Sequence, residues 1–235
     1  PGFDLNDMGY MKETDYLMNE TEIMYRQTDI WKIFRYNAFT LSQKNMWNYG
    51  GTPFSNNASL RWQSMTMNRY EWDVKETFAW NWLDSRLLRG GPDVRFGSYF
   101  LTSAKFNTDK AKRMMFMLKY EGDHNFEGNR FNTISPSLTF RLGNHVYLSG
   151  QLDYAWNTDE MQYVATTSPL SSSSLTPYYY VMGHMDQKTY GLTLKLQVNV
   201  TPDISIQFYG APFTSIAKYD DFKLAADTKS HTFEN

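Results

Sequence analysis

The side chains best suited to chemistry are scattered along this chain. The histidines are His124, His145, His184 and His231. None stands in the H-x-x-H or H-E-x-x-H spacing that places two ligands on one metal ion. Cysteine is absent, which excludes disulfides and thiolate-bound metals. We therefore predict no metal site and no cofactor.

Motifs of catalysis are also missing. The chain contains no G-x-S-x-G, P-loop or Rossmann fingerprint. A serine run, Ser171 to Ser174, precedes His184, so a hydrolase that brings Ser and His together from adjacent strands stays open as an alternative. We interpret the Ser/Pro-rich segment 168–177 as a solvated external loop. The prediction is a protein with no catalytic residues.

One hairpin gives the clearest signal of secondary structure. Residues 190–209 alternate apolar and polar side chains on both sides of the turn Thr201-Pro202-Asp203. Successive side chains of a strand point to opposite faces, so this hairpin has one apolar and one polar face. In a soluble sheet the apolar face packs in a core, whereas in an outer-membrane barrel it meets lipid. The apolar positions are Tyr190, Leu192, Leu194, Leu196, Val198, Val200, Ile204, Ile206 and Phe208.

The whole chain reads as strands, and helical periodicity is weak throughout. Many of the predicted strands exceed ten residues, whereas soluble strands usually have five or six. A strand that crosses a membrane needs about 9–11 residues. The predicted strands are 14–27, 30–46, 58–67, 70–84, 93–104, 113–121, 131–141, 145–157, 178–200 and 204–213.

The connections between these strands alternate in length. Short turns are predicted at 28–29, 68–69, 107–110, 143–144 and 201–203, and long loops at 47–57, 85–92, 122–130 and 158–177. Alternate connections of a meander lie at opposite ends, so this parity puts all the short turns at one end, as in bacterial outer-membrane barrels. We predict an all-β, antiparallel, up-and-down transmembrane β-barrel of about ten strands. Residues 1–235 would be one domain and part of a larger barrel.

Composition agrees with this class without deciding it. The formal charge of −2 gives no support for nucleic-acid binding. No run of 18 apolar residues could form a transmembrane helix. The mean hydropathy of −0.58 fits a soluble protein and also a barrel, in which lumen and lipid-facing residues average out. Aromatic residues make up 17%, as is typical where an apolar surface meets water.

Two sets of residues are candidates for function. Arg89, Gly90, Gly91 and Pro92 form a turn that we interpret as folded back at the barrel mouth, with a ligand site as the alternative. Glu76 falls on an apolar face, where it must lie near an interface, be protonated or be covered by a neighbour. The polar face is predicted to line the lumen with both signs of charge, which argues against strong ion selectivity. Its members are Glu71, Asp73, Lys75, Arg113, Lys119, Gln151, Asp153, Lys195, Gln197 and Asn199.

The sequence also resembles a known family. The matching segments are 1–11, 88–92 (LRGGP), 136–141 (PSLTFR), 180–187 (YVMGHMDQ), 201–213 and 219–222 (YDDF). They resemble a family of Gram-negative outer-membrane β-barrels of unknown function, which usually follow a module similar to carbohydrate-binding module family nine. The resemblance implies a barrel and brings no catalytic residues with it. It also implies that further strands and a sugar-binding-like domain flank this chain.

These observations predict a channel, an uptake component or a membrane anchor, linked through the resemblance to carbohydrate utilisation. The expected location is the outer membrane, with short turns in the periplasm and long loops outside. Expected partners are lipid and lipopolysaccharide, an outer-membrane or surface protein, and a small-molecule or glycan solute. A plugged barrel that docks a partner protein, and a soluble carbohydrate-binding β-protein, are the alternatives.

Overall fold

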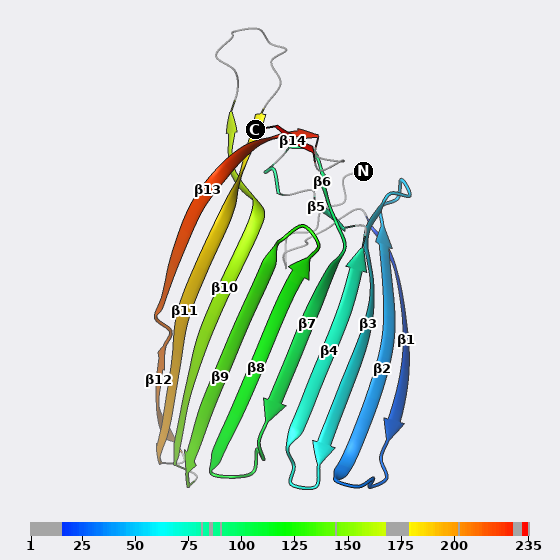
Figure 1. Ribbon diagram of the computed structural model, residues 1–235. Helices are drawn as coiled ribbons and strands as arrows, with labels where there is room; N and C mark the ends of the chain where they lie inside the picture. Colours follow the sequence, from blue (N-terminus) through cyan, green and yellow to red (C-terminus); the bar gives the residue numbers. More distant parts are fainter. Residues whose placement is uncertain are drawn as a thin grey trace.

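The computed structural model describes residues 16–80, 82–84, 87–89, 91–143, 145–167, 179–201, 203–227 and 232–234, and every element in them is a strand (Figure 1). All the pairings are antiparallel, which confirms the all-β antiparallel class. The strands are β1 (Leu17–Gln27), β2 (Phe34–Trp47), β3 (Pro53–Thr66), β4 (Glu71–Trp80), β5 (Trp82–Asp84), β6 (Val94–Phe96), β7 (Tyr99–Asn107), β8 (Met114–Asn125), β9 (Arg130–Leu142), β10 (Val146–Thr167), β11 (Tyr179–Thr201), β12 (Ile204–Gly210), β13 (Phe213–Asp227) and β14 (Thr232–Glu234).

One large sheet contains all of these strands except β5 and β6. Its order is β1-β2-β3-β4-β7-β8-β9-β10-β11-β13-β14, so neighbours in sequence are neighbours in space, as in the predicted meander. β12 pairs with the turn end of β11 and β13 with its other end. β12 and β13 together occupy one strand position in the sheet, which we call a rung. This rung is interrupted at Ala211-Pro212, because proline has no N–H to donate to the neighbouring strand.

Several predicted boundaries are wrong. The predicted strand 70–84 ends at Trp80, and β5 and β6 form a separate two-stranded sheet between β4 and β7. The last predicted strand, 204–213, continues to Asp227. Two predicted long loops, 47–57 and 122–130, shrink to 48–52 and 126–129, because the polar residues at their ends continue the ladder. The first ten residues of the predicted loop 158–177 belong to β10, and its Ser/Pro-rich part, 168–177, lies outside the described residues. Among the described residues, the parity in connection length therefore survives only for 81–98, between β4 and β7.

One face of the large sheet is apolar across every rung, and we call it the apolar face. Cross-strand partners share a face, and the register sets Ile23 opposite Leu41 and Leu41 opposite Leu60. The sequence alone left the faces of these first two strands unassigned. The same face carries Leu118, Leu138, Leu152, Leu194 and Ile206 on the later rungs. These side chains are exposed, Leu60 and Leu152 by 57% each, although they are large and apolar.

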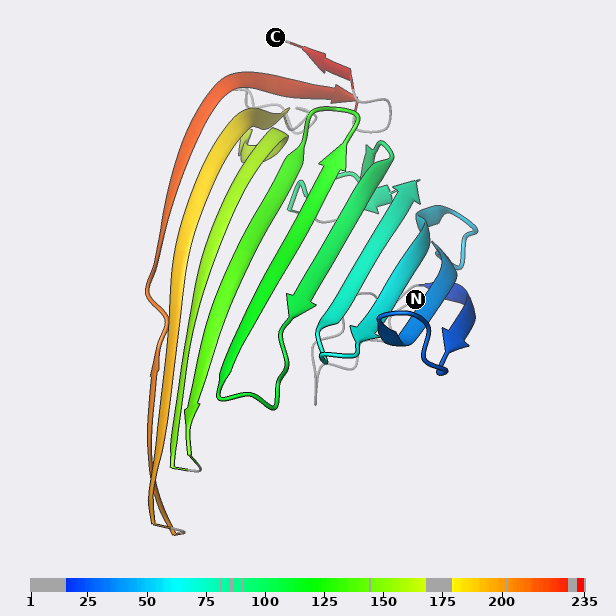
Figure 2. The ribbon, with the colours of Figure 1, turned by 60° about the horizontal axis from the view of Figure 1, so that its bottom comes forward.

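The opposite face, which we call the polar face, is the concave one. Its small side chains shield one another, and Ala38, Ser59, Thr77, Ala79 and Ser135 are each less than 9% exposed. Residues from seven strands of the large sheet, β3, β4 and β7 to β11, also line a single cavity on this face. A flat sheet could not bring strands so far apart to one cavity. Figure 2 shows the curvature of the sheet and the longer reach of β10, β11 and β13.

The largest buried apolar cluster described belongs to the β5–β6 hairpin. Leu88 and Val94 pack against Met161 of β10 and Met182 of β11, and each of the four is at most 6% exposed. Bulges between Asp159 and Gln162 and between Met182 and His184 interrupt the ladders at this level. The hairpin is therefore fastened to the loop-side ends of β10 and β11 (Figure 1).

The sheet is open in the part of the chain that the structure describes. No pairing joins β1 at one edge to β13 or β14 at the other. The predicted closure into a barrel is thus not found within these residues.

A truncation tests the attachment of the hairpin. Leu88→Ala should weaken it by about 2–4 kcal/mol, because it leaves a cavity among buried apolar side chains. Faster amide hydrogen exchange and proteolysis of residues 82–96 would report the loss. Leu60→Ala removes the same atoms from an exposed position and should leave the hairpin protected. Equal loosening by both variants would contradict this account.

Candidate functional site

The residues predicted to line a lumen all come to the polar face. Asp73 pairs with Lys105 and Lys105 with Lys119 across neighbouring strands, and Lys195 stands opposite Ser149. Arg113 lies just before β8, where its carbonyl accepts a hydrogen bond from the Arg141 amide. The other predicted members, on the same face by register, are Glu71, Lys75, Gln151, Asp153, Gln197 and Asn199. That this face borders a water-filled lumen stays a prediction.

Several charges on the strand part of this face have partners of opposite sign. Arg61 donates from Nε to Asp73 Oδ1 at 2.8 Å, and Gln63 Nε2 donates to the same carboxylate at 3.2 Å. Lys119 and Glu121 form an ion pair at 2.7 Å. Other members of the face also have partners: Glu71 pairs with Lys110, Asp153 accepts from Gln151 and Ser135, and Lys195 lies 5.7 Å from the centre of the Tyr209 ring.

Glu76, the acidic residue on the apolar face, is partly satisfied by its neighbour. It is exposed, and Thr102 donates a hydroxyl hydrogen bond to its Oε2 at 2.7 Å. Of the three predicted accommodations, a covering neighbour is the one that this contact supports.

A cavity of about 750 Å³ opens above the paired charges, at the loop end of the polar face. Asp84 and Phe96 of the β5–β6 hairpin lie on one side of it, and strands β3 to β11 form the other. Tyr99 and Phe131 add aromatic surface. The remaining polar lining is rich in amides, namely Asn57, Asn125, Asn129, Asn157, Gln162 and Gln187. Amides both donate and accept hydrogen bonds, so the lining suits a polar ligand.

Two carboxylates in this cavity have no ion-pair partner among the described residues. Asp123 lies near the loop end of the polar row of β8, and burial raises the pKa of its carboxyl. Asp159 precedes the bulge of β10, and burial raises its pKa as well, against the hydrogen bond that the Met161 amide donates to it at 2.9 Å. Burial also raises the pKa of the neighbouring Tyr99 hydroxyl. Each shift has the same cause, since charged forms lose solvation inside the cavity.

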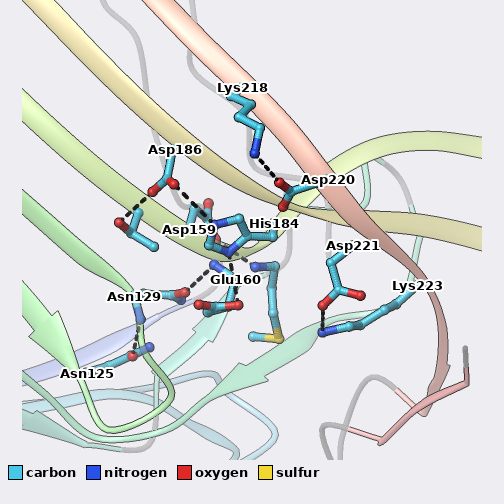
Figure 3. Close-up of polar contacts among 12 residues, drawn as sticks. Asn125, Asn129, Asp159, Glu160, His184, Asp186, Lys218, Asp220, Asp221 and Lys223 are labelled. Carbon is cyan, nitrogen blue, oxygen red and sulfur yellow. Dashed lines mark hydrogen bonds and ion pairs between the residues drawn. The ribbon is translucent and has the colours of Figure 1, made fainter.

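A second polar cluster lies where β10, β11 and β13 rise beyond the apolar segment (Figure 3). His184 Nδ1 is 3.1 Å from Glu160 Oε2, and its Nε2 is 3.5 Å from Asp186 Oδ2. The hydrogen bond with Glu160, followed by the charge of Asp186, raises the pKa of His184. Lys218 pairs with Asp220 at 2.7 Å on the next rung. The contact between His184 and Glu160 ties β11 to β10, and the described contacts of His184 include no nucleophile.

The predicted turn 89–92 is held in place by ring contacts. Arg89 has a positive φ of 48°, and its guanidinium lies 5.1 Å from the centre of the Tyr163 ring. A Cβ on Gly91 would lie 2.6 Å from the Tyr180 ring, so a larger residue there would have to displace this ring. Gly90 lies outside the described residues, and Pro92 leads into β6. These contacts favour the structural interpretation of the turn, folded back against β10 and β11.

The cavity residues were missed by sequence reasoning for one reason. The predicted strands stopped at Glu121 and Asn157, and the alternation continues one step further, to Asp123 and Asp159. Gly122 and the polar residues beyond it looked like a loop. Extending the period-two pattern by two residues would have placed both carboxylates on the polar face.

The described residues contain no helix long and apolar enough to cross a membrane. Nor do they hold a cluster of three or more His, Asp or Glu side chains that could bind a metal ion. The chain is thus an antiparallel all-β protein with one exposed apolar face and one polar, concave face.

This chain belongs to the family described as "Domain of unknown function (DUF5916)", whose model matches residues 1–234. The family agrees with the unknown-function part of the predicted resemblance. Its membrane location and its sugar-binding neighbour stay predictions. No curated protein and no solved structure matches the chain.

The His184 cluster gives a pH prediction. A raised pKa in the folded protein means that the histidine adds stability below its unfolded pKa of about 6.5 and loses it as pH rises through the folded value. Protection of β10 and β11 against hydrogen exchange, corrected for intrinsic rates, should fall between about pH 6 and 8. His184→Gln should flatten this dependence. A wild-type profile that is already flat would count against the coupling.

Proposed function

We propose that this chain forms part of the wall of a transmembrane β-barrel in a bacterial outer membrane and acts there as a solute channel or uptake component. One observation carries the proposal: large apolar side chains are exposed along one face of the sheet, while most of the buried small and polar side chains lie on the concave face. Soluble proteins have the opposite arrangement, because water drives apolar surface inward. In lipid the observed arrangement is favourable.

The dimensions of the apolar face support the same proposal. On β10 this face runs from Val146 to Trp156, ten residue steps or about 33 Å of extended strand. A tilt of about 40° would reduce this to about 25 Å, the height of the apolar band of such barrels. Three aromatic side chains, Tyr154, Trp156 and Tyr190, lie at its loop-side limit. The ring centre of Tyr154 is 5.1 Å from that of Trp156 and 5.0 Å from that of Tyr190. Aromatic rings of this kind favour the lipid–water boundary.

In this proposal the short connections 28–33, 67–70 and 108–113 lie on the periplasmic side, and the long connection that carries the β5–β6 hairpin lies on the outer side. Lipid and lipopolysaccharide cover the apolar face. Strands from elsewhere would complete the wall, because an unpaired edge in hydrocarbon leaves several kcal/mol of polar groups unsatisfied. The link to carbohydrate utilisation rests on the sequence resemblance alone.

A plugged barrel that docks a partner protein is the second candidate. The packing of Leu88 and Val94 against Met161 and Met182 favours it, since the hairpin then occupies part of the interior. A soluble carbohydrate-binding protein fits less well. A soluble sandwich would cover the apolar face with a second sheet, and none of the described residues does so.

Lysine placed on either face of one strand tests the orientation. Leu152→Lys should block assembly into outer membranes, because a lysine near the middle of the bilayer costs about 2–4 kcal/mol on the lipid face. Gln151→Lys, one residue earlier on the polar face, should assemble normally. Heat-modifiable gel migration of full-length protein from membranes would measure assembly. Wild-type protein that purifies as a freely soluble monomer without detergent would refute the proposal, and equal behaviour of the two variants would refute the assignment of faces.

A further inference from the structure

The cavity under the β5–β6 hairpin has the size and the walls of a ligand site. Its volume of about 750 Å³ lies within the range of about 300–1,000 Å³ that is usual for small-molecule pockets. The hairpin that forms one wall is fixed to β10 and β11 by the buried apolar cluster around Leu88, so this wall is a stable part of the fold. Phe96, Tyr99 and Phe131 provide rings on different sides of the space.

Charge is sorted along the polar face. Nearer the turns, Asp73 is matched by Arg61 and Glu121 by Lys119. At the cavity, Asp123 and Asp159 have no ion-pair partner among the described residues. The described lining holds a third carboxylate, Asp84, which accepts a hydrogen bond from the Leu87 amide, and a single cation, Arg130. The described lining of the cavity therefore holds more carboxylates than cations, next to a stretch of wall where Asp73 and Glu121 have ion-pair partners.

We propose that this cavity binds a small organic ammonium compound, with Asp123 and Asp159 as its counter-ions. A role of this site in solute transport rests on the proposed function. Binding of the ammonium compound rests on the cavity alone. An ammonium group would replace the solvation that burial removes from the carboxylates. The rings of Tyr99 and Phe131 attract a cation through their faces.

Other ligand classes fit this lining less well. An anion would meet uncompensated carboxylates. A neutral polyol could bond the amides of Asn57 and Gln187 and would leave the charge of Asp123 unbalanced. The chemistry of the lining thus selects for positive charge first and for hydrogen bonding second.

Calorimetry on the full-length protein in detergent tests the inference, with putrescine as the probe and glucose as the neutral control. Putrescine should bind saturably with Kd below about 1 mM. Asp123→Asn should weaken its binding about tenfold, because a charge-assisted hydrogen bond is lost. Arg130→Gln should tighten it severalfold by removing the one cation of the described lining. Asp203→Asn makes the same charge change at the far turn and should leave the affinity unchanged.

Asp123→Asn is expected to fold, since it removes a charge that burial disfavours, and its heat-modifiable migration checks this. Absence of saturable putrescine binding would overturn the inference. So would equal binding of glucose that is indifferent to Asp123→Asn. Protein that binds putrescine and never enters membranes would refute the proposed function and leave the site standing. Protein that assembles in membranes and binds no putrescine would refute the binding site and leave the proposed function standing.

Discussion

The register of backbone hydrogen bonds is the constraint on which the whole structure depends. Each strand alternates its side chains between two faces, and cross-strand pairing carries that choice to the next strand. Ile23 pairs with Leu41 and Leu41 with Leu60, so the face on which one of these side chains lies fixes the face of the other two. A slip by one residue in any ladder would exchange the faces of every later strand. The division into an apolar and a polar face is therefore a property of the sheet as a whole.

The β5–β6 hairpin departs from this order. It leaves the ladder after Trp80 and attaches through Leu88 and Val94 to the loop-side ends of β10 and β11, where bulges break the strict alternation. This attachment forms the apolar cluster, holds the turn at Arg89 in place and provides one wall of the cavity. The hairpin and the bulges of β10 and β11 thus shape a concave space at this end of the sheet.

Alternation was enough to predict the strands, the turn end of the sheet and the face of residues such as Asp73, Lys119 and Lys195. Strand ends were harder, because a ladder continues wherever a partner offers hydrogen bonds, whatever the polarity of the side chain. Asp123 and Asp159 fell outside the predicted strands for that reason. The hairpin contacts of Leu88 join residues far apart in sequence, and no local pattern encodes such packing. Interruption at Pro212 could have been anticipated, since its missing N–H is visible in the sequence.

β1 has a consequence for how such a wall is built. Among the described strands it is an exposed edge strand that pairs with β2 alone, so its outer row of amides and carbonyls needs a partner. Water supplies that partner, and hydrocarbon does not. In a membrane setting this sheet could not enter strand by strand and wait for its last neighbour. Closure and insertion would have to be one event, with the order of assembly fixed by whichever strand reaches this edge.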